Sequence, residues 1–355
     1  MKPRARVQAG TAARGEAPLR VVAVGGGNGL STLLRGLRVY ATASAPWAPP
    51  SLDITAVVTV TDDGGSSGRL RREFAVLPPG DIRNCMVALS GDEALLSRLF
   101  QYRFPTGRGL KGHSFGNLFL TALSNVTGDF AKAVKVSSEV LAIAGHIHPS
   151  TATNVALEAT LADATTVVGE TRISRSRVRI QKIALRPRRC RPLRETLDAI
   201  AEADLITLGP GSLFTSVIPN LLVEGIPRAI RGSPAIKAYV ANLMWQPGET
   251  VGFSASDHVR AILDHSCKDL LDCVVVNTQP IAGPLRRKYA RQSAQPVAND
   301  VDQLRAMGLS VIEADLVEQK GKVRHDPVAL AGRVLELAAE GRKRRLRRQR
   351  AKPLD

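Results

Sequence analysis

Residues 19–32 read Leu-Arg-Val-Val-Ala-Val-Gly-Gly-Gly-Asn-Gly-Leu-Ser-Thr, and this stretch decides the fold. The apolar run 21–24 has no polar alternation, which is typical of a strand buried on both faces. Leucines at 30, 33, 34 and 37 follow at helical spacing. We therefore expect a strand, a glycine turn and a helix, the units of an α/β fold built on parallel strands.

A glycine turn between a strand and a helix can hold a ligand phosphate. Glycines let the backbone approach the ligand, and the helix N-terminus presents free N–H groups. The order Gly-Gly-Gly-Asn-Gly matches neither Gly-x-Gly-x-x-Gly nor a Walker loop, so it names no cofactor. The alternative is a tight turn without a ligand. The candidate ligand-binding residues here are Gly25, Gly26, Gly27, Asn28 and Gly29.

Composition indicates a soluble globular protein. The chain has 355 residues, 44% hydrophobic and 23% charged. We expect a cytoplasmic protein, because no apolar run approaches the ~18 residues of a membrane span and the N-terminus lacks the apolar core of a signal peptide. The four cysteines are scattered without a CxxC pair, which favours reduced thiols over disulfides or a zinc site.

The formal net charge of +17 is concentrated at the two ends of the chain. Residues 342–355 supply +7 and residues 1–20 supply +4. We expect residues 1–19 and 341–355 to be disordered basic tails around one α/β domain at 20–340. The C-terminal tail is a possible contact for nucleic acid, but it has no aromatic residues to stack on bases, so the solvated tail is favoured.

A second candidate loop follows the apolar strand predicted over 54–60. It reads Thr-Asp-Asp-Gly-Gly-Ser-Ser-Gly over residues 61–68. Asp62 and Asp63 are suited to holding Mg²⁺ or a ribose, and Ser66 and Ser67 to donating hydrogen bonds to phosphate. The alternative is an Asx turn, which explains one aspartate but not the whole string.

Two further polar sets lie at expected helix starts. Asp81 is a plausible N-cap of a helix that ends near residue 89, with Arg83 and Asn84 in its first turn. His113 lies at the mouth of an apolar helix, with Asn117 one turn further on. These residues either cap the helices or line a pocket, because buried polar groups need partners.

The apolar pattern alternates between about residues 150 and 190, which predicts a small antiparallel β-meander inserted in the α/β body. Parallel-type strands then resume at 204–208, 237–243 and 272–277. Two of them run into polar loops, at 209–216 and 242–250. In a parallel sheet such strand ends converge on one crevice. The candidate ligand-binding residues of these loops are Gly211, Ser212, Thr215, Asn242 and Gln246.

Six ordered motifs resemble those of the YvcK family of gluconeogenesis factors, within the larger superfamily of the 2-phospho-L-lactate transferase CofD. The resemblance covers about residues 20–335. It rests on the glycine turn at 25–31, Thr61–Leu70, Pro79–Asn84, Gly112–Leu118, Gly209–Val223 and Gln246–Thr250.

The resemblance implies a Rossmann-like three-layer α/β/α fold with a mostly parallel sheet. It also implies a cytoplasmic homodimer that binds UDP-sugars such as UDP-N-acetylglucosamine. The family's role is in growth on gluconeogenic carbon sources, cell shape and peptidoglycan precursor allocation, with an unknown protein partner in cell-wall synthesis.

The same resemblance assigns Tyr289 to stacking on the nucleotide and Arg324 to the diphosphate; ordinary surface packing is the alternative. Two residues depart from the family pattern. Asn28 stands where the family often has Thr, and Trp245 stands where Thr is usual. A tryptophan beside the crevice can either stack on a base or sugar or fill the space.

Two functions remain open from the sequence. The first is a non-catalytic nucleotide-sugar-binding regulator that requires no cofactor, because the crevice motifs contain no obvious nucleophile–base pair. The alternative is a transferase of the phospho-lactyl type, in which Mg²⁺ on Asp62 and Asp63 stabilises the transferred group. The loop strings resemble the non-transferase branch more closely, so the regulator is the preferred prediction.

Overall fold

The computed structural model describes residues 17–42, 52–91 and 95–350. The expected N-terminal tail lies almost wholly outside these residues. The sheet begins at Leu19, one residue before the predicted domain start. No helix of the described residues is long and apolar enough to cross a membrane. All four cysteines are free, as the scattered spacing predicted.

A 7-stranded sheet forms the centre of the domain, and every strand pair in it is parallel. The strand order, β10-β9-β8-β7-β1-β2-β3, runs outward in both directions from the neighbours β1 and β7. The strands are β1 (Leu19–Gly25), β2 (Leu52–Val58), β3 (His146–Pro149), β7 (Leu205–Leu208), β8 (Ile236–Val240), β9 (Cys273–Asn277) and β10 (Ser310–Ala314).

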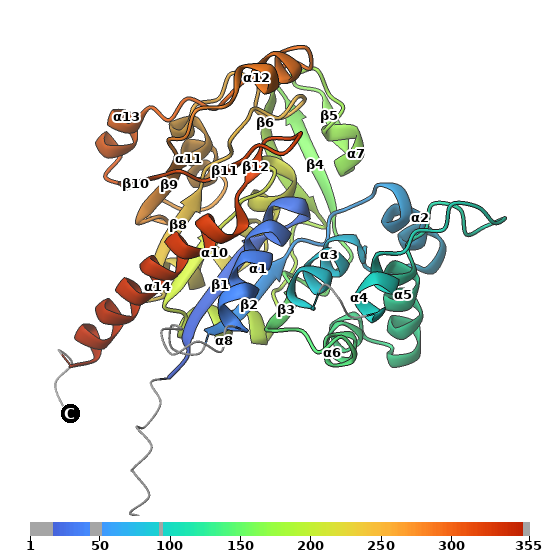
Figure 1. Ribbon diagram of the computed structural model, residues 1–355. Coiled ribbons are helices and arrows are strands. Elements are labelled where there is room, and N and C mark those ends of the chain that lie inside the picture. Colours follow the sequence, from blue (N-terminus) through green and yellow to red (C-terminus); the bar gives the residue numbers. More distant parts are fainter. Residues whose placement is uncertain (1–16, 43–51, 92–94, 351–355) are drawn as a thin grey trace, which may run out of the picture.

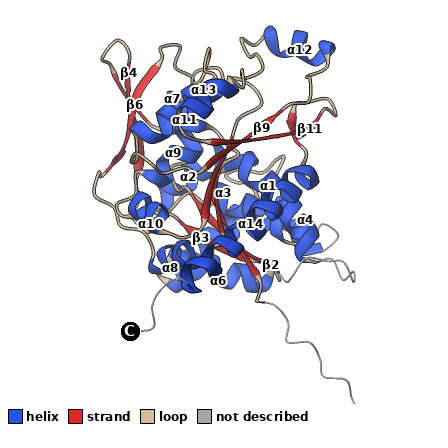
Figure 2. Ribbon diagram, turned by 90° about the vertical axis from the view of Figure 1, so that its left-hand side faces the viewer, coloured by secondary structure: helices blue, strands red, loops and turns tan. Residues whose placement is uncertain are grey.

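Helices cover both faces of this sheet, as Figure 2 shows. On one face α1 (Gly27–Ala41) packs against α3 (Gly80–Leu89) and α14 (Pro327–Arg350). On the other face lie α8 (Arg194–Glu202), α10 (Ile226–Gly232) and α11 (Ala255–Asp264). The predicted Rossmann-like three-layer fold is therefore confirmed.

The opening stretch forms the middle of the core. Residues 21–24 of β1 are buried, and register pairs Val21 with Ile54 of β2 on one side and Leu205 of β7 on the other. The leucines of α1 at 30, 33, 34 and 37 are fully buried against the sheet. A strand with apolar neighbours on both edges and both faces explains why its sequence shows no alternation.

The predicted meander is also confirmed. Strands β4 (Ala156–Leu161), β5 (Thr166–Val168) and β6 (Ile180–Arg186) form a 3-stranded antiparallel sheet in the order β5-β4-β6. The short helix α7 (Glu170–Ile173) lies between β5 and β6. Figure 1 shows this unit at the same end of the molecule as the short strand β12.

The other elements are short or lie outside the main sheet. They are α2 (Gly65–Phe74), α4 (Leu95–Gln101), α5 (Phe115–Thr127), α6 (Phe130–Val140), the π-helix η1 (Leu213–Val217), α9 (Ile218–Leu221), α12 (Gly283–Ala290), α13 (Val301–Ala306) and the antiparallel pair β11 (Val317–Glu318) and β12 (Arg324–His325).

The prediction of a disordered tail from residue 341 is wrong as far as Arg350, because α14 continues to that residue. Arg342 and Arg345 each lie 2.9 Å from a carboxylate oxygen of Asp204, a residue with no exposed surface. Asp204 also accepts the Arg20 N–H at 3.0 Å. Composition alone could not show this buried partner, which gives part of the basic run a structural role.

Candidate functional site

A crevice lies at the point where the strand order reverses, between the carboxyl ends of β1 and β7. The loops that leave these strands touch. A Cβ atom on Gly29 would lie 2.4 Å from the carbonyl oxygen of Pro210, so only glycine allows this approach. Open α/β sheets bind ligands at such a switch point. The structure therefore brings the two glycine loops together, as the sequence predicted.

The crevice encloses about 380 Å³. Ten of the residues predicted to bind ligand line it: Gly26, Gly27, Asn28, Gly29, Asp81, Gly211, Ser212, Asn242, Gln246 and Arg324. Gly25 ends β1 beneath the crevice, where its carbonyl accepts the side-chain amide of Asn220 at 3.2 Å.

The floor of the crevice is the N-terminus of α1. Gly27 starts the helix with a φ of 60°, in the left-handed region that favours glycine. No side chain caps this helix at its N-cap residue, Gly26. The backbone N–H groups of Asn28 and Gly29 in the first turn therefore remain for a ligand, and the helix dipole favours an anion there.

Asp81 does not cap its own helix, so that prediction is wrong. Pro79 occupies the N-cap position and Asp81 lies in the first turn of α3. Its carboxylate instead accepts the backbone N–H of Gly27. A Cβ atom on Gly26 would lie 2.7 Å from the same carboxylate. Asp81 thus holds the first glycine loop.

Side chains joined by hydrogen bonds form the wall of the crevice opposite the first glycine loop. Gln246 donates to Ser212 at 2.6 Å and accepts from the amide of Asn242 at 3.1 Å. These bonds connect the second glycine loop, residues 209–216, to the loop that follows β8. Thr215 is turned away from the crevice, since its hydroxyl donates to the buried carboxylate of Glu249 at 3.1 Å.

Arg324 and His325 reach the crevice from β12. Arg324 is exposed and His325 is buried. Tyr289 is not among the lining residues; it packs on the small apolar cluster of Met244, Ile281 and Val317. The stacking role of Tyr289 therefore stays a prediction.

Two carboxyl groups in the crevice have pKa values raised to neutral pH or above. Burial, and then the charge of Asp62, raises the pKa of Asp81 to about 7. The same two causes, in the same order, raise the pKa of Glu170 to about 9. A neutral carboxyl group does not repel a phosphate and can donate a hydrogen bond. The acidic residues of the crevice are therefore compatible with an anionic ligand.

Asp62 and Asp63 lie outside the crevice lining and have separate partners. Asp62 accepts the Gly64 N–H at 2.8 Å, which is the Asx turn considered above. One oxygen of Asp63 accepts both the N–H and the hydroxyl of Thr171, at 2.9 and 2.6 Å. Within the described ranges, no group of three or more His, Cys, Asp or Glu residues is arranged to hold a metal ion. The role of the two aspartates in holding Mg²⁺ stays a prediction.

The predicted ligand-binding serines of the 61–68 loop form a buried hydrogen-bond network with His113 and Asn117. The Ser66 hydroxyl lies 2.9 Å from Nδ1 of His113, and Asn117 donates to Ser66 and Ser67 at 3.2 and 3.5 Å. These bonds join α2 to the start of α5. All four side chains are buried and none lines the crevice.

Arg83 and Asn84 line a different cavity, of about 530 Å³, in the groove between α1 and α3. Asn28 lines both this groove and the crevice. The two cavities therefore meet at the N-terminus of α1.

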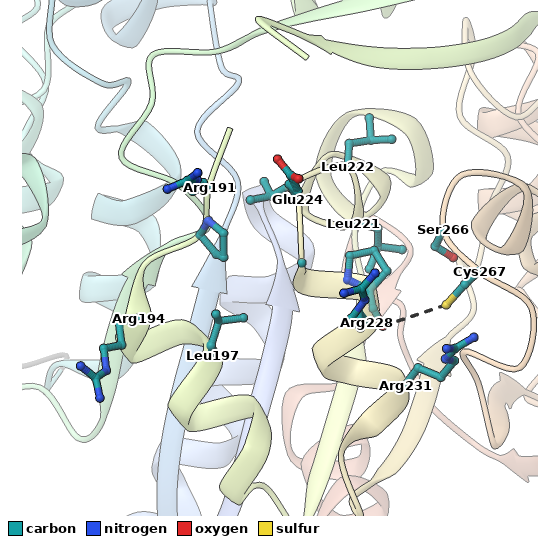
Figure 3. Close-up of a pocket in the computed structure, with 14 residues that line it drawn as sticks. Arg191, Arg194, Leu197, Leu221, Leu222, Glu224, Arg228, Arg231, Ser266 and Cys267 are labelled. Carbon is teal, nitrogen blue, oxygen red and sulfur yellow. Dashed lines mark hydrogen bonds between the residues drawn. The ribbon is translucent and has the colours of Figure 1, made fainter. Parts of the chain in front are cut away.

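Another cavity, of about 730 Å³, lies away from both sites, between α8 and α10. Figure 3 shows Arg191 and Arg194 on one side of it, and Arg228 and Arg231 on the other. It contains none of the residues predicted to bind ligand.

The family model described as "2-phospho-L-lactate transferase CofD" matches residues 21–317. This chain belongs to the CofD family. The "Gluconeogenesis factor" of Halalkalibacterium halodurans is 46% identical over 325 residues, which cover 91% of this chain and 97% of that protein. The protein of the same name in Bacillus subtilis is 46% identical over 322 residues, covering 90% and 98%.

The fold is shared with two solved structures of one related protein. The crystal structure of protein BH3568 from Bacillus halodurans has a TM-score of 0.85 and 46% identity, and covers 90% of this chain and 100% of that one. A second structure of that protein, described as a member of the UPF0052 family, has a TM-score of 0.83 and 45% identity. The resemblance stated from the motifs is confirmed.

Several lining residues of this CofD-family site were not predicted. Glu170 comes from α7 of the meander, which we had interpreted only as strands. Trp245 does not reach the crevice; its indole N–H donates to the Phe253 carbonyl at 2.9 Å. Pro210 and Ser216 lie in the predicted loop at 209–216, and Leu243 and Met244 lie in the predicted loop at 242–250, although none of the four was singled out. The lining residues absent from the predicted set are Glu170, Pro210, Ser216, Leu243, Met244, Val323 and His325.

Proposed function

We propose that this protein binds a nucleotide sugar of the UDP-N-acetylglucosamine type and acts as a non-catalytic regulator. The observation that carries the proposal is the crevice between the two glycine loops at the switch point. Its floor offers the uncapped N–H groups of α1, which suit a diphosphate. The name that its relatives carry, gluconeogenesis factor, supports a regulatory role in carbon metabolism.

Each part of the ligand has complementary groups in the crevice. The diphosphate would lie over Gly27–Gly29, opposite Ser212, with Arg324 on its exposed side. Asn242 and Gln246 offer amide donors and acceptors for the uracil or the sugar. With Glu170 protonated and Asp81 about half protonated at pH 7, this arrangement would carry less carboxylate charge than its two acidic residues suggest.

We further propose that the protein works in the cytoplasm as a homodimer. Its roles would be in growth on gluconeogenic carbon sources and in cell shape through peptidoglycan precursor allocation, with a protein partner in cell-wall synthesis. These proposals rest on the YvcK resemblance. Among the described residues, no helix is long and apolar enough to cross a membrane.

Isothermal titration calorimetry with UDP-N-acetylglucosamine tests the binding proposal. Arg324→Gln removes an exposed cation and should weaken binding about ten-fold, the usual worth of a hydrogen bond to a charged group. Gly29→Ala pushes a methyl group into the Pro210 carbonyl and should abolish binding. Gly232→Ala is the matched control, because nothing lies within 4 Å of its added Cβ. No heat with the wild-type protein at millimolar ligand would refute the proposal.

The description of the family model favours a second candidate, a Mg²⁺-dependent transferase of the phospho-lactyl type. Asp62 would then act in the reaction. Product formation from lactyl-diphosphoguanosine and a deazaflavin acceptor would establish this activity, and its loss in Asp62→Asn would support the role of Asp62. The transferase is the second choice because Asp62 and Asp63 each accept hydrogen bonds from different groups of the protein in this structure.

A further inference from the structure

The groove between α1 and α3 has the chemistry of an anion site. Its polar lining consists of Asn28, Ser31, Arg35, Arg83, Asn84 and Gln101. Two of these side chains are cationic and none is a carboxylate. The remaining lining residues, Val87 and Ala88, are apolar. A ligand here would meet only hydrogen-bond donors, amides and a small apolar floor.

Arg83 is a partly buried cation that forms no direct ion pair within the described residues, although the more distant charges of Asp81 and Asp62 favour its charged form. Its only hydrogen bond in the described structure runs from Nη2 to the neutral amide oxygen of Asn84, at 2.5 Å. Its Nε is buried and has no partner. Burial, and then the charge of Arg103, lowers the pKa of Arg83. Such an unpaired guanidinium destabilises the folded protein unless an anion binds it.

The position of Arg83 is built into the fold. Gly116, in the first turn of α5, lies against the stem of Arg83. A Cβ atom there would lie 2.9 Å from both Cγ and Cδ of that arginine. The bare backbone of α5 thus leaves a channel that directs the side chain toward the groove. Arg35, exposed on α1, adds the second cation from the opposite wall.

We propose that this groove binds the phosphoryl or carboxyl group of a second small ligand, at a site separate from the nucleotide-sugar crevice. The guanidinium of Arg83 provides a planar donor that matches either group. Because Asn28 belongs to both cavities, the second ligand lies beside the first at the N-terminus of α1. A protein with two such sites can respond to two metabolites at once.

Thermal shift and calorimetry with inorganic phosphate and with malonate test this proposal. Both titrations are run with the crevice occupied by saturating UDP-N-acetylglucosamine and again without it. We expect at least one of the two anions to raise the Tm of the wild-type protein under both conditions. The anion that raises the Tm more shows whether the groove prefers a phosphoryl or a carboxyl group.

Three variants locate the effect. Arg83→Met removes the unpaired charge, so it should raise the Tm of the ligand-free protein and weaken anion binding about ten-fold or more. Arg35→Gln should leave the ligand-free Tm unchanged and weaken the anion less. Arg228→Gln, which removes an exposed arginine from the cavity in Figure 3, should behave as wild type.

Each contrary result overturns the proposal. These are no Tm rise with either anion, an unchanged rise in Arg83→Met, or a rise lost in Arg228→Gln. Loss of anion binding when UDP-N-acetylglucosamine is added would show a single shared site. If the nucleotide sugar fails to bind while the Arg83-dependent anion effect persists, the proposed function fails and this inference stands.

Discussion

The hydroxyl oxygen of Tyr289 accepts the backbone N–H of Val323 at 3.1 Å. Val323 lines the crevice and immediately precedes Arg324. One hydrogen bond therefore connects α12, which lies outside the main sheet, to the short strand that carries the cation of the crevice. This geometry gives Tyr289 a role in positioning Arg324.

Tyr289→Phe separates positioning from stacking. The phenylalanine keeps the ring but loses the hydroxyl, so a positioning role predicts an affinity for UDP-N-acetylglucosamine about three- to ten-fold weaker. A stacking role predicts no change in this variant and a large loss in Tyr289→Leu. Calorimetry on the two variants, with Arg324→Gln for comparison, decides between them.

Ligand affinity should fall as the pH rises from about 6 to about 9, where Asp81 and Glu170 lose their protons. Each carboxylate formed adds a negative charge beside the proposed diphosphate. Asp81→Asn should remove the part of this dependence near pH 7, and Glu170→Gln the part near pH 9. Affinities that stay constant in the wild-type protein across this range would contradict the assignment of these protons.

The same shift affects stability. The pKa of Asp81 is raised from 3.8 to about 7 on folding, so the folded state binds more protons and stability falls as the pH rises above about 4. Asp81→Asn should therefore unfold at higher urea concentration than wild type at about pH 8, by up to about 4 kcal/mol. The difference should disappear below about pH 3, where the carboxyl group is protonated in both the folded and the unfolded state. A variant that is less stable at both values would show that the Gly27 contact outweighs the charge.

Among the buried residues, Asp204 should be one of the most sensitive to substitution. Asp204→Ala leaves Arg342 and Arg345 without their buried partner, which should lower the free energy of unfolding by about 3–5 kcal/mol. Asp198→Ala is the matched control, because its pair with Arg194 is exposed; it should cost less than about 1 kcal/mol. Urea denaturation of both variants makes the comparison. Equal, small losses would show that Asp204 does not anchor α14.

Local sequence predicted the parts of this molecule that depend on neighbouring residues. The apolar run 21–24 and the leucines of α1 identified the central strand and helix, and alternation between about residues 150 and 190 identified the meander. The convergence of the two glycine loops also followed, because parallel strands present their carboxyl ends at one edge.

Long-range contacts could not be predicted in this way. The partner of Arg342 lies 138 residues away in the chain, and Asp81 reaches Gly27 from the connection that follows the next strand, β2. Strand β3 contains only His146–Pro149 and shows no strand pattern of its own, since pairing with β2 creates it. Glu170 lines the crevice next to Thr171, which hydrogen-bonds to Asp63, 108 residues away in the chain.

The central claim is that a nucleotide diphosphate binds between the two glycine loops. A crystal structure of the protein with UDP-N-acetylglucosamine tests it most directly. The account predicts diphosphate oxygens within about 3 Å of the first-turn N–H groups of α1, with Arg324 on the outer side and Asn242 or Gln246 on the uracil or sugar. Ligand bound elsewhere, for example in the cavity between α8 and α10, with the crevice empty, would contradict it.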